Sequence, residues 1–105
     1  MIMDSCDKEV YKLFFGTLAN QSRLKILNIL RSGQKNVKEI CRETEFEQSM
    51  VSHNLKMLEY HGMVFVEKKG KFRYYDLNKK TIKPLLELID AHMREYCCKI
   101  ARGER

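Results

Sequence analysis

The sequence lacks the features of a membrane protein, a secreted protein and a disulfide-based scaffold. No apolar run approaches the roughly 18 residues that a membrane-spanning helix requires, so we expect no membrane partner. The first residues show no cationic segment followed by an apolar one, so we expect no signal peptide. Four cysteines are too few and too irregularly spaced for a disulfide framework; they are Cys6, Cys41, Cys97 and Cys98. These absences predict a cytoplasmic protein with reduced thiols.

Catalytic patterns are missing as well. The chain has no glycine-rich phosphate loop, no Ser/His/Asp order and no paired acids in a cleft context, so we expect that it is not an enzyme. Repeats, low-complexity stretches and linkers are also lacking. The 105 residues therefore predict one domain, spanning residues 1–105. A domain of this size buries only about 60–70% of its unfolded surface, which favours burial of more surface against a partner.

Positive charge is in excess. The chain has 20 Lys and Arg against 14 Asp and Glu, a net charge of +6. With 44% hydrophobic and 32% charged residues, the composition is otherwise that of an ordinary globular protein. The basic excess favours a polyanionic partner such as nucleic acid, although many basic proteins bind none.

Apolar periodicity and turn residues predict a mainly helical fold with one β-hairpin. Asn20 is a good N-cap for the second helix, Gly62 ends the fourth, and Pro84 fits the first turn of the last. A two-stranded hairpin is expected to turn at Gly70. The expected elements are helices at about 5–18, 21–33, 37–43, 48–61 and 81–101, and a hairpin at about 63–77. This order is that of a winged helix-turn-helix, with the helix-turn-helix at about 37–61 and the wing at about 63–77.

The last helix carries an apolar stripe that a domain this small has nothing to cover. A twin helix from a second copy, together with the first helix, would bury it. We therefore expect a homodimer held by the helices at about 5–18 and 81–101. The expected interface residues are Val10, Leu13, Phe14, Ile82, Leu85, Leu86, Ile89, Met93 and Tyr96.

Three segments resemble motifs of the arsenic-repressor (ArsR/SmtB) family of winged-helix regulators. Residues 18–27, LANQSRLKIL, resemble the opening of that family's second helix, and residues 48–58, QSMVSHNLKML, resemble its recognition helix. Residues 62–64, GMV, and 70–77, GKFRYYDL, resemble the segment that leads into the wing and the wing itself. The resemblance implies a winged-helix repressor that releases DNA when a metal, a metalloid or an oxidant alters the dimer.

Three positions depart from the family pattern. Glu45 stands where the family often has Gly, so it would be strained at a positive φ. Glu47 replaces a Ser or Asp cap and caps poorly, although an acid suits a helix N-terminus. Asn54 stands where the family usually has His, and His53 lies one residue earlier. The departures leave open which base edges are read.

The polar residues at the start and outer face of the fourth helix, and the cations of the hairpin, are the expected DNA contacts. Gln, Ser and His side chains can reach bases or phosphates, and Lys and Arg can hold the phosphate backbone. The alternative is a solvated helix face beside a hairpin whose charges only aid solubility. The expected contacts are Gln48, Ser49, Ser52, His53, Lys56, Lys68, Lys69, Lys71 and Arg73.

The cysteines are candidates for binding a thiophilic metal(loid) ion. Cys41 lies in a segment that resembles the family's metal site on the third helix, and Cys6 could supply a second ligand across the dimer. The adjacent Cys97 and Cys98 could hold arsenite or a similar ion. In each case the alternative is a small buried or interface-filling residue.

The family's zinc site on the last helix is incomplete in this sequence. Asp90 and His92 resemble its first half, but the second half is missing, because position 103 is Gly. Asp90 is expected to pair with Arg94, one turn further along the helix.

The leading interpretation is a homodimeric repressor of double-stranded operator DNA, released by a thiophilic metal(loid) or a thiol-reactive signal. The alternatives are a winged-helix protein-interaction module, an effector-independent DNA-binding regulator and a thiol-based metal carrier. Basic residues in the hairpin favour DNA over protein docking.

Overall fold

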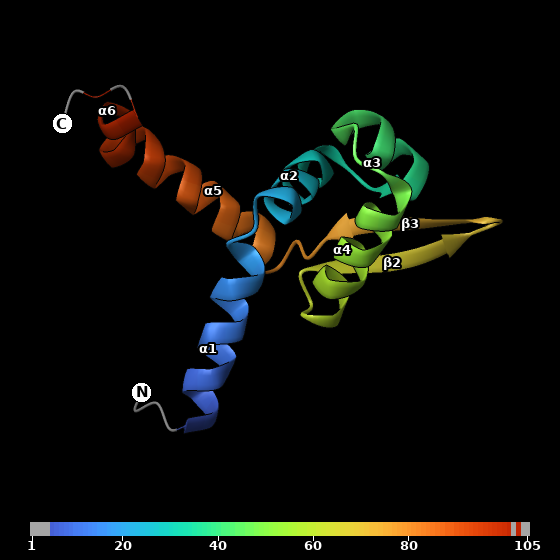
Figure 1. Cartoon of the computed structure of the whole chain (residues 1–105), viewed down its shortest axis with the longest axis horizontal. Helices are drawn as coiled ribbons and strands as arrows, with labels where there is room; N and C mark the ends of the chain where they lie inside the picture. The colour runs from blue at the N-terminus through green and yellow to red at the C-terminus, as the bar shows by residue number, and fades with distance from the viewer. Residues whose placement is uncertain (1–4, 102, 104–105) are drawn as a thin grey trace.

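The computed structural model describes the backbone of residues 5–101 and 103, and the side chains of residues 8–100 and 103. Most of it is helical, with a small three-stranded antiparallel sheet (Figure 1). Within this described part, no helix is both long and apolar enough to cross a membrane. The expected fold class, a mainly helical winged helix-turn-helix, is confirmed.

The first two helices, α1 (Ser5–Leu18) and α2 (Gln21–Ile29), meet at Asn20. The Asn20 side chain accepts a hydrogen bond from the backbone N–H of Arg23 at 3.0 Å, which confirms Asn20 as the N-cap of α2. A 3₁₀ turn, η1 (Leu30–Ser32), continues α2 as far as Gly33.

The helix-turn-helix consists of α3 (Val37–Thr44) and α4 (Gln48–Tyr60). Asn36 and Glu39 form a capping box that satisfies two backbone N–H groups at the start of α3. Between the helices, Glu45 has a φ of 63°, so the strain expected at this position is present. Glu47 makes no side-chain capping bond to α4, as its residue type predicts.

The wing consists of β2 (Val64–Lys69) and β3 (Phe72–Leu77), which turn at Gly70 with a φ of 62°. The expected hairpin is present, and the sheet also has a third strand that the sequence did not predict. A short strand, β1 (Lys35–Asn36), pairs with β3, so the strand order is β1-β3-β2. Two residues are too few to show an alternating pattern, and β1 is held by its partner rather than by its own sequence.

The C-terminal segment forms one rod of three helical pieces, α5 (Ile82–His92), a π-helical turn η2 (Met93–Cys97) and α6 (Cys98–Ala101). In Figure 1, this rod and α1 leave the same side of the winged-helix body and diverge from each other. The two elements with the longest exposed apolar faces therefore project on the side opposite the wing.

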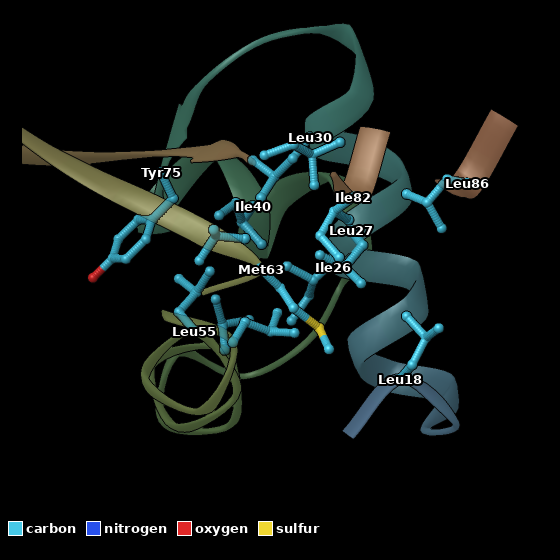
Figure 2. Close-up of a cluster of buried hydrophobic side chains, with 14 residues drawn as sticks. Leu18, Ile26, Leu27, Leu30, Ile40, Leu55, Met63, Tyr75, Ile82 and Leu86 are labelled. Atoms are coloured by element: carbon cyan, nitrogen blue, oxygen red, sulfur yellow. The ribbon is translucent and has the colours of Figure 1, made fainter. Parts of the chain in front are cut away.

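The hydrophobic core lies where α2, α3, α4, the sheet and the start of α5 meet (Figure 2). Leu27 of α2, Ile40 of α3 and Leu55 of α4 are fully buried there. Ile82 and Leu86, predicted at the dimer interface, are each only 4% exposed and belong to this core. Their burial leaves little side-chain surface for a partner, because the apolar stripe of α5 serves two surfaces and its spacing does not distinguish them.

Candidate nucleic-acid interface

Helix α4 turns one apolar face to the core and one polar face to solvent. Val51, Leu55 and Leu58 follow each other at steps of four and three residues and are fully buried. The residues predicted to contact DNA lie outside this stripe and are all exposed; they are Gln48, Ser49, Ser52, His53 and Lys56. The face is therefore free to approach another molecule.

Asn54 lies on the inner side of α4 and is only 6% exposed. Its Oδ1 accepts a long hydrogen bond, 3.4 Å, from Nη1 of Arg23 in α2. Nε of the same arginine donates to the carbonyl oxygen of Thr17, near the end of α1, at 2.8 Å. Asn54 thus links α4 to α2, and little of its side chain is left exposed. This role was not predicted from the sequence; the position of a polar residue within the apolar stripe of α4 could have indicated it.

The turn before α4 is held by Lys25, which, like Arg23, belongs to α2. No role was predicted for this residue from the sequence. Lys25 Nζ donates to the carbonyl oxygen of Thr44 at 3.3 Å and lies 5.2 Å from the ring centroid of Phe46. Thr44 Oγ1 in turn accepts from the Phe46 N–H at 3.2 Å. These contacts fix the C-terminus of α3 and hence the point at which α4 begins.

The basic residues of the wing are divided between its two faces, because side chains alternate along a strand. Lys68 lies directly opposite Arg73. Two positions away along the hairpin, Val66 lies directly opposite Tyr75. All four side chains therefore share one face. Since Tyr75 is buried, this is the face that turns toward the helices.

Lys69 lies on the other face of the wing, opposite Phe72. Its Nζ is 5.6 Å from the ring centroid of Tyr74, close enough for a cation–π contact. Lys71 follows Gly70 in the turn and is exposed. The four predicted cations of the wing thus occupy three different environments.

A groove of about 550 Å³ separates the wing from the helix-turn-helix. One wall carries Lys71 and Arg73, and the other carries Lys38 and Cys41 of α3 together with Gln48 at the tip of α4. The groove therefore joins the polar tip of α4 to the cations of the wing. Cys41 is half-buried in this wall, on the side of the molecule that carries the predicted DNA contacts.

The projecting helices expose apolar side chains. Val10 and Leu13 of α1, and Met93 and Tyr96 of η2, are exposed by half or more, and Ile89 is 37% exposed. A second groove, of about 710 Å³, lies between α1 and the start of α5, and Leu13, Phe14 and Leu85 line it. Apolar surface of this extent on a small domain indicates an interface with another molecule.

Among the described residues, the predicted thiol ligands lie on separate elements. Cys41 is in α3, whereas Cys97 and Cys98 are at the far end of the rod, half-buried and exposed respectively. The side chain of Cys6 lies outside the described residues. Among the residues described, no three Cys, His, Asp or Glu side chains are grouped so that they could hold a metal ion.

Asp90 pairs with Arg31 of η1 rather than with Arg94, so the local pair expected from the sequence was wrong. Arg31 Nη2 lies 2.6 Å from Asp90 Oδ2. His92, the other half of the incomplete zinc pattern, contacts the ring of Tyr96 at a centroid distance of 5.0 Å. The carboxylate of Asp90 is therefore paired with a residue that is distant in the sequence.

Comparison with known proteins agrees with this geometry. The family model described as "Bacterial regulatory protein, arsR family" matches residues 20–65. The arsenical resistance operon repressor of Bacillus subtilis (strain 168) is 33% identical over 100 residues, covering 91% of this chain and 90% of that protein. The chain belongs to the arsR family. The family resemblance seen in the sequence is thereby confirmed, and this ArsR-family chain is a transcriptional regulator.

Other relatives of this ArsR-family regulator agree with the assignment. The transcriptional activator HlyU of Vibrio cholerae is 32% identical over 80 residues, covering 76% of this chain and 71% of that protein. A solution structure of a homodimeric winged helix-turn-helix DNA-binding domain from Mycobacterium bovis superposes with a TM-score of 0.80 at 26% identity. That match covers 92% of this chain and 94% of the other. The relatives named here are transcriptional regulators and a DNA-binding domain, not enzymes.

Proposed function

We propose that this protein is a homodimeric, non-enzymatic repressor that acts in the cytoplasm on a two-fold double-stranded DNA operator. Helix α4 would enter the major groove and the wing would hold the adjacent backbone. The observation that carries the proposal is the polar face of α4 beside the cationic face of the wing, with a groove joining them. Gln48, Ser49, Ser52, His53 and Lys56 are the proposed groove-facing contacts.

The pair Lys68 and Arg73 supports a phosphate contact. Two like charges directly opposite each other on a hairpin destabilise it. The described structure gives this pair no ion-pair partner, so an anion between the two cations would remove the repulsion. A DNA phosphate meets that requirement, and Lys71 in the adjoining turn would add a second backbone contact.

We propose that residues 1–105 act as one domain that pairs with a second copy through α1 and the C-terminal rod. The homodimeric Mycobacterium bovis domain, which has the same fold, supports this arrangement. The exposed apolar residues of the two elements would form the interface, whereas Ile82 and Leu86 serve the protomer core. The proposed interface residues are Val10, Leu13, Phe14, Leu85, Ile89, Met93 and Tyr96.

The function can be tested by fluorescence anisotropy with labelled duplexes, using the region upstream of the protein's own gene and a random duplex of equal length. We expect a preference for the upstream region. Gln48→Ala and Ser52→Ala should mainly reduce that preference, whereas Lys71→Ala should weaken binding to both duplexes. Lys80→Ala, which removes an exposed cation outside α4 and the wing, is the matched control. A wild-type protein without any preference would refute the repressor assignment.

We also propose that any release signal acts through Cys97 and Cys98 rather than through Asp90 and His92. The two thiols are adjacent on the rod, close to the proposed dimer interface, whereas Asp90 is held by Arg31. Relatives include regulators named for arsenical and cadmium resistance, which supports a thiophilic ion as the signal. Among the described residues of one protomer the thiols do not complete a site, so we propose that two copies contribute.

Titration of arsenite, cadmium and zinc against a protein–DNA complex tests this assignment. The double variant Cys97→Ser/Cys98→Ser should lose its response to arsenite and cadmium, whereas Cys41→Ser serves as the matched single-thiol control. Release by zinc with an unchanged response in the double variant would contradict the assignment. If no ion releases the DNA, the protein is an effector-independent regulator with respect to these ions.

A further inference from the structure

The angle at which the C-terminal rod leaves the body is set by a few residues at its root. Ile82 and Leu86, one turn apart, are buried in the core, whereas Leu88, Ile89 and Met93 are exposed. The rod spans residues 82–101, which at 1.5 Å per residue is about 30 Å. A tilt of about 10° at the root would therefore move its far end by about 5 Å.

Asp90 occupies the next position of the stripe that faces the body. It follows Ile82 and Leu86 at steps of four residues, so it lies on the same face of α5, one turn further out. Here a carboxylate replaces the apolar residue that the stripe predicts. Asp90 Oδ2 lies 2.6 Å from Nη2 of Arg31 in η1. The side chain of Asp90 is 45% exposed, and that of Arg31 is 27% exposed.

The guanidinium of Arg31 is also held by a residue of the winged-helix body. Arg31 Nη1 donates to Asn28 Oδ1 at 3.1 Å, while Nη2 faces the carboxylate. Asn28 is in α2, and Arg31 follows it in η1. The arginine therefore presents a fixed donor to α5, and a charge-assisted hydrogen bond is directional as well as attractive.

We propose that Arg31 and Asp90 form a tether that sets the angle between the rod and the winged-helix body. This inference rests on the proposed dimer and on the proposed function. The rod carries the dimer interface and the body carries α4, so the tether fixes the distance between the two α4 helices. Half-sites about 34 Å apart on one DNA face require a defined distance. Arg31 and Asp90 are thus positioning residues, and neither touches DNA.

Both side chains of the Arg31–Asp90 pair are partly exposed. A partly exposed ion pair contributes little to stability, so its loss should leave the fold and the dimer intact. Burial of Ile82 and Leu86 would still attach α5 to the body. The Arg31–Asp90 pair fixes the direction of the rod, because it restrains the rod at a second point, one turn beyond the buried residues.

The first test measures the pose without DNA. A spin label on an unnatural amino acid that replaces Lys56, on the exposed face of α4, gives one inter-protomer distance by pulsed electron paramagnetic resonance. We expect a narrow distance distribution for the otherwise unmodified protein and a distribution broadened by about 5 Å in Asp90→Asn. The reversed pair, Arg31→Glu/Asp90→Arg, should restore the narrow distribution. Lys79→Gln, which breaks the exposed Asp76–Lys79 pair, is the control and should change nothing.

The second test measures binding to duplexes whose two half-sites are separated by different numbers of base pairs. Asp90→Asn should reduce the preference for the best spacing by about fivefold, which corresponds to about 1 kcal/mol. The melting temperature and dimer mass should stay close to those of the wild type, and the reversed pair should restore the preference. A purely structural role would lower the melting temperature and leave the spacing preference unchanged.

The two tests separate the tether from the function on which it rests. An unchanged distance distribution in Asp90→Asn overturns the tether, whatever the protein does with DNA. A broadened distribution that the reversed pair restores supports it. If the wild-type protein prefers no duplex over random DNA, the proposed function fails, and the distance measurement alone decides whether the tether exists.

Discussion

Lys68 and Arg73 lie directly opposite each other on the helix-facing side of the wing, and Lys68→Thr is the change that best tests their role. Threonine suits a strand and removes one of the two opposed charges. The free protein should therefore become slightly more stable, by a few tenths of a kcal/mol, because a like-charge repulsion is lost. DNA binding should become weaker and less dependent on salt.

The size of the salt effect follows from the number of phosphates. A dimer loses two contacts, so the slope of log K against log salt should become shallower by about 1.8. Between about 50 and 200 mM salt, a change of about 0.6 log units, the wild type should lose about twelvefold more affinity than the variant. Fluorescence anisotropy with a fixed duplex at four salt concentrations measures the slope, and urea unfolding measures the stability.

Lys69→Thr is the matched control, since it removes the same charge from the other face of the same strand. It also removes the cation–π contact with Tyr74, so it should destabilise the hairpin slightly rather than stabilise it. Its effect on the salt slope should be clearly smaller. An unchanged slope in Lys68→Thr would show that the helix-facing side of the wing does not hold phosphate. Equal changes in the two variants would show that phosphate contact is not confined to that side.

Three further changes test how the protomer is built. Asn54→Leu should lower the free energy of unfolding in urea by about 1–3 kcal/mol, because it leaves Nη1 of Arg23 without its acceptor in a partly buried place. Glu45→Gly should raise it by up to about 1 kcal/mol, because φ is positive there, whereas Glu45→Ala should bring no such gain. Ile89→Asp should give a folded monomer, as measured by analytical ultracentrifugation and circular dichroism, whereas Leu86→Asp should unfold the chain. A folded dimeric Ile89→Asp variant would contradict the proposed interface.

Features that depend on local periodicity could be predicted from the sequence. The buried stripe Val51, Leu55 and Leu58 identifies the inner face of α4, and the exposed polar face follows from it. Asn20 is a reliable start signal, because an N-cap bonds within its own turn. The contiguous helix-turn-helix and wing motifs were likewise sufficient for the family and the fold.

Features that depend on distant partners could not be predicted. A local rule pairs Asp90 with Arg94, but the structure pairs it with Arg31, on an element that the sequence places far away. The link between Arg23 and Asn54 spans 31 positions in the sequence. In both cases a polar residue on an apolar stripe was visible, but its partner is known only once the helices are packed.

Under the proposed function, the charges around α4 would divide DNA affinity from DNA recognition. Glu45 and Glu47 are exposed at the tip of α4, where two carboxylates oppose the approach of phosphate. Because the tip would repel the backbone, the proposed contacts assign the attraction to DNA mainly to the wing and to Lys56. They assign the reading of base edges to Gln48 and its neighbours. Changes in the wing should therefore alter affinity for every duplex, and changes at the tip should alter the choice between duplexes. Under the proposed function, an acidic turn in the helix-turn-helix is compatible with DNA binding, because the proposed phosphate contacts lie in the wing and at Lys56.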